Sequence, residues 1–300
     1  MLPSQTQRLL MLIAVAVGTP LWWWAASGLR PDDGLPGWTL GGAGAVFAHS
    51  SAGAWAAGVV ILAGVPAALA GAVLAATGNP LSGLACAAGS AALAFGGASG
   101  LGVARRAADA GRTEPYFPAL MIETALWCVL LTLLSAAIDR GGRQLRGRLP
   151  DRLTSRSLGG GVRLLGFSVG ALWAGLITAV LGGVLALGLL RSDDPGQILG
   201  GLFVAFTLAS LIGFAIAPHD RPWPTLLAPG LVALVGYGWA AWQLRGRDEM
   251  LLAAWYQGTL PALALGLPVH YLTAGVLGCC LGTGVGQLLE HVKRSDAFTA

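Results

Sequence analysis

One carboxyl group stands within an otherwise apolar stretch and is the first candidate for chemistry. Glu123 lies in "FPALMIETALW", six residues into a predicted membrane helix that begins near residue 117, which is about 9 Å at 1.5 Å per residue. A carboxylate at the centre of a bilayer costs about 2.5–3.5 kcal/mol, so such groups usually face a partner or line a ligand or proton pathway. The alternative is a structural carboxyl group that reaches the membrane surface or binds Thr113 or Arg112.

Two histidines are further candidates for a ligand or proton pathway. His270 follows Pro268 by two residues in the last apolar stretch, and His49 is the only His, Asp, Glu, Lys or Arg between Trp38 and Ala104. Imidazole is suited to proton transfer and to metal binding. The alternatives are structural: His270 bonds to a carbonyl group freed by the proline kink, and His49 is a polar turn residue near the membrane surface.

Small residues recur every four positions in the same last stretch. Ala274, Gly278, Gly282 and Gly286 share one face of a predicted helix, and His270 extends the row. Within membranes this spacing lets a second helix backbone approach closely. We call these four residues the glycine stripe, and they predict tight packing against another helix.

The four cysteines predict neither a metal centre nor a disulfide framework. Cys86, Cys128, Cys279 and Cys280 lie in apolar segments without C-x-x-C spacing, and we interpret them as buried small hydrophobic residues. The sequence has no Walker-type loop, no dinucleotide-binding fingerprint and no cluster of His and Cys at metal-binding spacing. We therefore expect no metal, no cofactor and no nucleic-acid partner.

A serine supports the one hypothesis of enzyme activity. "GASG", Gly97 to Gly100, is similar to the GxSG motif of rhomboid proteases, whose serine is paired with a histidine on a later helix. The resemblance implies Ser99 as nucleophile and His270 as its base, but Thr273 replaces the glycine of that family's HxxG pattern. Because a serine nucleophile needs its base within hydrogen-bond reach, an intramembrane enzyme is the least favoured class.

The elements that must position these residues are membrane helices. The 300-residue chain is 55% hydrophobic and only 11% charged, against roughly 25% charged in soluble domains. Its apolar runs predict an all-α polytopic membrane protein with about eight transmembrane helices. The predicted spans are 9–27, 52–76, 82–104, 117–138, 164–190, 197–217, 225–243 and 260–288. Residues 38–51 are too apolar for an ordinary loop and form either a re-entrant piece or a ninth span.

A basic segment divides the chain and orients it. Seven of the 18 basic residues lie within 140–163, which the positive-inside rule places in the cytoplasm. This linker separates a first four-helix half, residues 1–139, from a second, residues 164–300. With eight spans, both termini are expected on the cytoplasmic side of the cell (inner) membrane. The three arginines within 105–112 run against this orientation, and the high ratio of arginine to lysine is typical of a GC-rich, bacterial genome.

Similar short sequence segments recur in the two halves in the same order. "RLL" occurs at Arg8 and Arg163, and "LRPDD" at Leu29 resembles "LRSDD" at Leu190. A duplication of four plus four helices would be a parallel repeat with a pseudo-twofold axis along the membrane normal. In a chain so rich in Ala, Gly and Leu such matches also arise by chance, so the internal repeat is one of two alternatives.

Three functional classes are compatible with the sequence. A multi-pass subunit or scaffold is favoured, because few charged groups lie in the spans and Gly/Ala faces suit a membrane-protein partner or a homo-oligomer. The alternative is a small-solute transporter with a site between the halves, which gains if Glu123 and His270 face one water-filled cavity. The subunit hypothesis gains if the glycine stripe faces lipid in the isolated chain.

Overall fold

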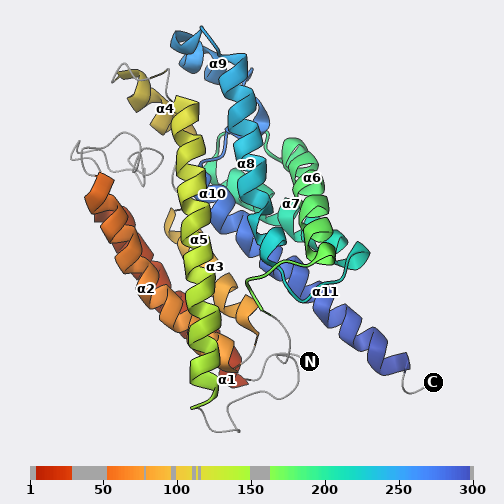
Figure 1. Ribbon diagram of the computed structural model, residues 1–300. Coiled ribbons are helices and arrows are strands. Elements are labelled where there is room, and N and C mark those ends of the chain that lie inside the picture. Colours follow the sequence, from red (N-terminus) through yellow and green to blue (C-terminus); the bar gives the residue numbers. More distant parts are fainter. Residues whose placement is uncertain are drawn as a thin grey trace.

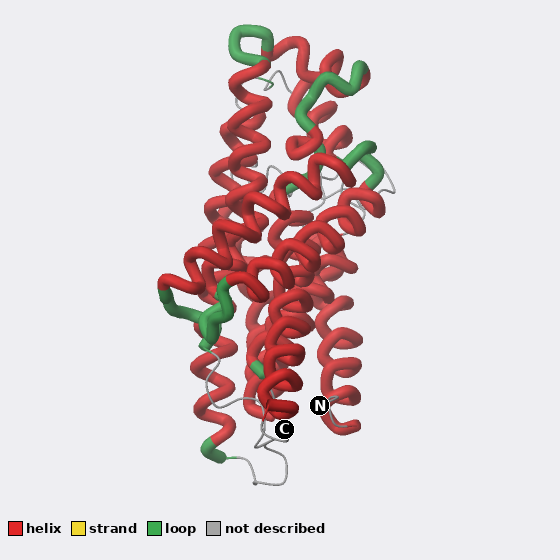
Figure 2. Tube along the Cα trace, turned by 90° about the vertical axis from the view of Figure 1, so that its right-hand side faces the viewer, coloured by secondary structure: helices red, strands yellow, loops and turns green. Residues whose placement is uncertain are grey.

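The computed structural model describes residues 5–28, 53–77, 79–95, 99–109, 113, 116–148 and 163–297. Within these ranges the chain is helical and contains no strand (Figures 1 and 2). The α-helices are α1 (Gln5–Gly28), α2 (Gly53–Thr77), α3 (Pro80–Phe95), α4 (Gly100–Asp109), α5 (Tyr116–Arg146), α6 (Val169–Leu189), α7 (Pro195–Ile216), α8 (Trp223–Gln243), α9 (Leu251–Tyr256), α10 (Pro268–His270) and α11 (Val276–Ala297). Two 3-10 turns, Asp248–Met250 and Ala262–Ala264, flank α9, and a π-helical turn, Tyr271–Gly275, joins α10 to α11.

Short polar residues fix where several of these helices begin. The Ser168 hydroxyl accepts a hydrogen bond from the Ala171 amide at the start of α6, and the Asp194 carboxylate accepts one from the Gln197 amide at the start of α7. Such caps satisfy amide groups that have no partner inside the helix. Pro195 then occupies the first turn of α7, where its missing N–H costs nothing.

Five helical stretches are long and apolar enough to cross a membrane. They are α5, α6, α7, α8 and Pro268–Lys293, which contains α10 and most of α11; three shorter apolar stretches belong to α1, α2 and α3. Large apolar side chains such as Leu172, Trp173 and Leu176 on α6 are more than half exposed. A surface of this kind suits a lipid environment. The described chain is therefore an all-helical membrane protein, although five such stretches do not establish the predicted number of eight.

The helices form two groups that meet along two contacts. Helices α1, α2, α3 and α5 pack together, and so do α6, α7, α8 and α11. The groups are joined where α5 packs on α8 and where α11 packs on α3. Along the first contact the two helices run antiparallel, since Met121 of α5 lies near Gly238 of α8 and Cys128 lies near Gly230. Figure 1 shows α5 and α8 side by side in the middle of the molecule.

Several predicted spans differ from the helices observed. Helix α5 continues to Arg146, past the predicted end at residue 138 and into the predicted linker, and α6 begins at Val169 instead of residue 164. Residues 82–104 hold two helices, α3 and α4, and the helix predicted to begin at residue 260 begins only at Pro268. Proline at 261 and 268 and glycine at 258 explain the later start, because proline cannot supply a backbone donor and Gly258 has a φ of +65°. The segment 38–51, proposed as a re-entrant piece or a ninth span, lies outside the described residues.

Candidate functional site

Glu123 is buried in the first half of α5, on the helix that contacts the other group. Its side chain is 1% exposed. Its Oε1 atom accepts a hydrogen bond of 3.2 Å from the indole N–H of Trp127, one helical turn further on. Its Oε2 atom has no hydrogen-bond partner among the described residues. A carboxyl oxygen left this way inside a protein is uncommon and calls for a functional explanation.

Three buried tyrosines surround this part of α5. Tyr116, Tyr237 and Tyr271 are at most 2% exposed, and each hydroxyl donates a hydrogen bond to a backbone carbonyl oxygen. The acceptors are Gly100 at 3.2 Å, Gly266 at 2.6 Å and Leu263 at 2.7 Å, respectively. The tyrosines therefore tie α5, α8 and the last span to the start of α4 and to the irregular segment before Pro268.

The rings of these tyrosines form a continuous aromatic chain across the contact between the two groups. Tyr116 packs edge-on against Phe117 at 5.0 Å between ring centroids, Phe117 stacks on Tyr237 at 6.4 Å, and Tyr237 meets Tyr271 edge-on at 6.4 Å. Tyr116 and Glu123 are seven residues apart on α5 and therefore lie on the same face of that helix. We call Glu123, Trp127, Phe117 and the three tyrosines the Glu123 cluster.

An irregular backbone segment lies against this cluster. Residues 257–267 run back along the end of α8, where the Gln243 side chain donates to the Thr259 carbonyl oxygen at 2.9 Å and Gly236 lies against Leu263. Non-helical backbone at membrane depth is tolerated only where it is buried in protein or lines a cavity. The π-helical turn Tyr271–Gly275 follows directly. Such turns are frequent at functional sites.

His270 helps to end this irregular segment. It is fully buried, and its Nδ1 atom accepts a hydrogen bond of 3.2 Å from the Leu267 amide. An accepting Nδ1 carries no proton, so in this arrangement the ring is neutral with its proton on Nε2. This bond is not the one expected from the sequence, which was a bond to a carbonyl group freed by Pro268; here the ring accepts from the amide of the residue before the proline. His270 and Glu123 lie on elements that pack against each other, α10 and α5.

The other histidines are placed as follows. His49 lies outside the described residues. His219 follows α7, its Nδ1 lies 3.0 Å from the Ala217 carbonyl oxygen, and its ring packs on Phe214. Burial lowers the pKa of His219, and the bond to Ala217 and the charge of Asp220 oppose that change.

The glycine stripe faces α7 of the same chain. A methyl group added at Gly278 would lie 2.6 Å from the Phe203 carbonyl oxygen, and one added at Gly286 would lie 2.5 Å from the Phe214 ring. At Gly282 it would meet the Ser210 hydroxyl and the Thr207 carbonyl oxygen. Ala274 is buried at the start of this row. The stripe therefore brings the α7 and α11 backbones together within one chain.

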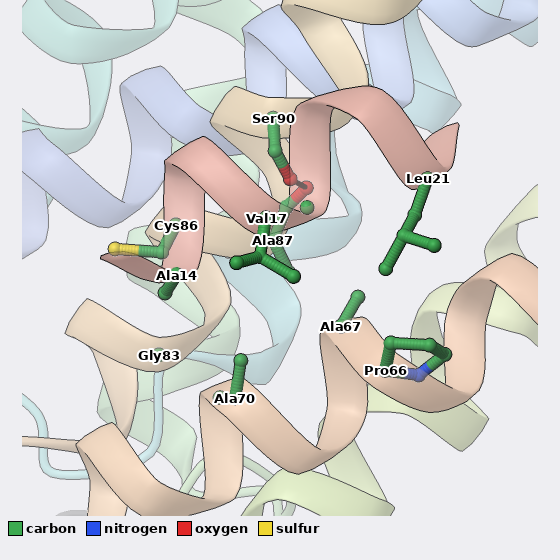
Figure 3. Close-up of a pocket in the computed structure, with 12 residues that line it drawn as sticks. Ala14, Val17, Leu21, Pro66, Ala67, Ala70, Gly83, Cys86, Ala87 and Ser90 are labelled. Atoms are coloured by element: carbon green, nitrogen blue, oxygen red, sulfur yellow. Dashed lines mark hydrogen bonds between the residues drawn. The ribbon is translucent and has the colours of Figure 1, made fainter. Parts of the chain in front are cut away.

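A small cavity lies away from the Glu123 cluster, among α1, α2 and α3 (Figure 3). Its volume of about 20 Å³ suffices for a single water molecule. Its lining is small and apolar apart from Ser90 and Cys86, and the Ser90 hydroxyl donates to the Ala87 carbonyl oxygen. The cavity is too small and too apolar to be a solute site.

Within the described residues the structure brings together no group of three or more His, Cys, Asp or Glu side chains that could hold a metal ion. The Ser99 hydroxyl accepts a hydrogen bond of 3.3 Å from the Gly102 amide, so this serine caps α4. That position gives the serine a structural role at a helix start. The catalytic hypothesis gains no geometric support from it.

The sequence indicates Glu123 as a candidate site residue but does not indicate the tyrosines of the cluster. A signal was present: the chain has only four tyrosines, and three of them belong to the Glu123 cluster. Because Tyr116, Tyr237 and Tyr271 are far apart in the sequence, only the fold shows that they meet.

Comparison of the chain with known protein families, with curated proteins and with solved structures finds no match.

Proposed function

We propose that this chain is a small-solute permease of the cell membrane, with its site between two four-helix halves. The observation that carries the proposal is the buried Glu123 carboxyl group, one oxygen of which has no hydrogen-bond partner among the described residues. Glu123 lies on α5, the helix through which one group contacts the other. A carboxyl group in an apolar interior needs a proton or a cation to neutralise it. Solute carriers bind cations as substrates and couple transport to the movement of protons or cations. The irregular segment beside the site supplies backbone of the kind that lines transport sites.

The order of helix packing supports a duplicated architecture. Helix α1 packs on α2 and α3, and α2 packs on α5; likewise, α6 packs on α7 and α8, and α7 packs on α11. If α3 corresponds to α8 and α5 to α11, a two-fold axis along the membrane normal converts the contact of α5 with α8 into the contact of α11 with α3. The extensive contact between α2 and α3 has no equally extensive counterpart between α7 and α8. We assign residues 1–139 and 164–300 to the two halves and residues 140–163 to the linker.

The directions of the helices support eight crossings. We add α1, α2 and α3 to the five long spans, because α1, α2, α3 and α5 alternate in direction along the chain. The end of the molecule where α5 and α11 end also holds the start of α1 (Figure 1). The basic residues next to these helix ends are Arg8, Arg140, Arg143, Arg146, Arg148 and Lys293. By the positive-inside rule we place this end, both termini and the linker in the cytoplasm.

The hypothesis that the sequence favoured, a subunit or scaffold of a larger assembly, draws no support from the glycine stripe. Gly278, Gly282 and Gly286 are already packed on α7, so this face is not open to a partner. A partner would have to bind elsewhere on the lipid-facing surface. Transport gives the Glu123 cluster a role within the single chain.

The proposal is tested with the full chain reconstituted into liposomes that contain a pH-sensitive dye. A panel of labelled amines, amino acids, sugars and carboxylates is offered with an imposed pH gradient. We expect uptake of at least one solute class, lumenal pH changes that accompany it, and a loss of at least roughly tenfold in Glu123→Gln, which corresponds to about 1.4 kcal/mol. Asp109→Asn, at an exposed carboxyl group on α4, is the matched control. Equal uptake by Glu123→Gln and wild type, or no uptake of any solute, contradicts the proposal.

A further inference from the structure

We propose that the Glu123 cluster binds a positively charged amine, a substituted ammonium ion, as the counterpart of the Glu123 carboxylate. The inference rests on the proposed function, because the cluster is closed in this structure and an amine reaches it only when the contact between α5 and α8 opens. Three features of the described residues lead to it: the charges, the hydrogen-bond donors and the aromatic faces.

The helices around Glu123 supply no positive side chain. Helix α5 packs against α2, α3, α8, α10 and the π-helical turn. None of the described residues of these elements is Lys or Arg, and α5 itself has none before Arg140. His270 is the one imidazole among them, and its Nδ1 accepts a hydrogen bond as a neutral ring does. Because no Lys or Arg of these described elements balances a Glu123 carboxylate, we assign the balancing charge to a ligand or a proton.

The hydrogen-bond donors of the cluster are already used. Each tyrosine hydroxyl donates to a backbone carbonyl oxygen, and the Trp127 indole donates to Glu123 itself. The nearby hydroxyls of Thr124 and Thr273 donate to carbonyl oxygens one turn earlier, at 2.7 Å and 2.6 Å. What these groups still offer is the lone pairs of their oxygens, together with the free Oε2 of Glu123. Acceptors of this kind suit a cation better than a carboxylate or a sugar.

The aromatic rings distinguish an organic cation from a metal ion. Trp127 donates a hydrogen bond to Glu123. Tyr116, on the same face of α5, begins the chain of ring contacts through Phe117 and Tyr237 to Tyr271. Aromatic faces attract ammonium groups and are used in proteins to bind quaternary amines. A hard metal ion instead needs several oxygen ligands, of which carboxylates are the main side-chain source, and the described residues bring no three such metal-binding groups together. The combination of one carboxylate with several rings fits an alkylammonium ion.

The test is binding by the full chain in mild detergent, measured by isothermal titration calorimetry with tetramethylammonium and methylammonium as probes. Sodium chloride and glycerol serve as a simple cation and a neutral solute. We expect saturable binding of at least one ammonium probe, no binding of glycerol, loss of that binding in Glu123→Gln, and unchanged binding in Asp109→Asn. Tyr237→Phe keeps the ring and should retain binding, whereas Tyr237→Leu should weaken it by roughly tenfold. Thermal unfolding of each variant identifies any that fails to fold, and the remaining variants decide the question.

Each remaining outcome has a defined meaning. If neither ammonium probe binds the wild type, or if Glu123→Gln binds them equally well, the proposal is overturned. If neither binds but pH titration shows that the wild type takes up one more proton than Glu123→Gln, the counterpart is a proton and the amine assignment is wrong. Ammonium binding without any uptake into liposomes would refute the permease proposal and leave the binding site standing. Uptake of an uncharged solute without ammonium binding would refute the ammonium site and leave the permease proposal standing.

Discussion

At the scale of single residues, His270 illustrates how one side chain holds an irregular backbone in place. Its ring accepts a hydrogen bond from the Leu267 amide at the point where the chain enters α10, and both residues are buried. Leu267 is the N-cap residue of α10, where an amide has no carbonyl acceptor within the helix. Buried donors are almost always paired, and leaving one unpaired costs about 1–3 kcal/mol.

We therefore expect His270→Ala to lower the free energy of unfolding by about 1–3 kcal/mol, because the Leu267 amide loses its acceptor. His270→Asn retains a short side-chain oxygen that suits the same amide and should recover part of the loss. Thermal unfolding in detergent, followed by circular dichroism, measures both. Equal unfolding temperatures for wild type and His270→Ala would mean that the bond from Leu267 does not contribute to stability.

At the scale of the elements, the contact between α7 and α11 depends on the absence of side chains. Gly282 is buried where the two backbones come closest, and a methyl group there would meet the Ser210 hydroxyl and the Thr207 carbonyl oxygen. Gly284, two residues further on in the same helix, has nothing within 4 Å of the same added atom. The two glycines therefore form a matched pair with the same chemistry and opposite surroundings.

Gly282→Ala should separate α7 from α11 and cost about 1–3 kcal/mol through overpacking, with Gly282→Leu costing more. Gly284→Ala should be neutral or slightly stabilising, because alanine is the better helix former. Thermal unfolding and native mass of the two variants, compared side by side, provide the measurement. If Gly282→Ala and Gly284→Ala behave alike, close approach of the two helices is not what the stripe provides.

At this scale the sequence predicts the helices but not the non-helical segments that interrupt the apolar runs. Apolar runs of membrane length indicate the long spans because a bilayer requires a satisfied backbone over about 20 residues. The run from residue 260 is equally apolar, yet its α-helix begins only at Pro268, since Pro261 and Pro268 break the pattern. Tyr237 and Tyr271 satisfy carbonyl groups in the segment before it. Those two bonds join distant parts of the chain, which hydropathy does not detect. Glu123 was predictable as a lone charge, whereas its tyrosine neighbours were not.

At the scale of the whole molecule, a permease and a subunit differ in what the intact chain needs around it. In the two-half arrangement we propose, the site and the glycine stripe are both complete within one chain, because α5 meets α8 and α11 meets α7 internally. The apolar side chains that remain exposed, among them Leu172, Trp173 and Leu176, require only lipid. A subunit would instead need a second protein to cover part of that surface.

We therefore expect the chain, purified in mild detergent from its own host, to have the native mass of a monomer or a homo-oligomer. Native mass spectrometry is the measurement, and Gly282→Leu is the comparison, because a contact made inside one chain should change its stability without changing its oligomeric state. A stoichiometric second protein in the wild-type sample would make the chain a subunit, and the chemistry of Glu123 would then have to be sought in the complex. A change of oligomeric state in Gly282→Leu would show that α11 also contacts a neighbouring chain, against the packing on α7 described above.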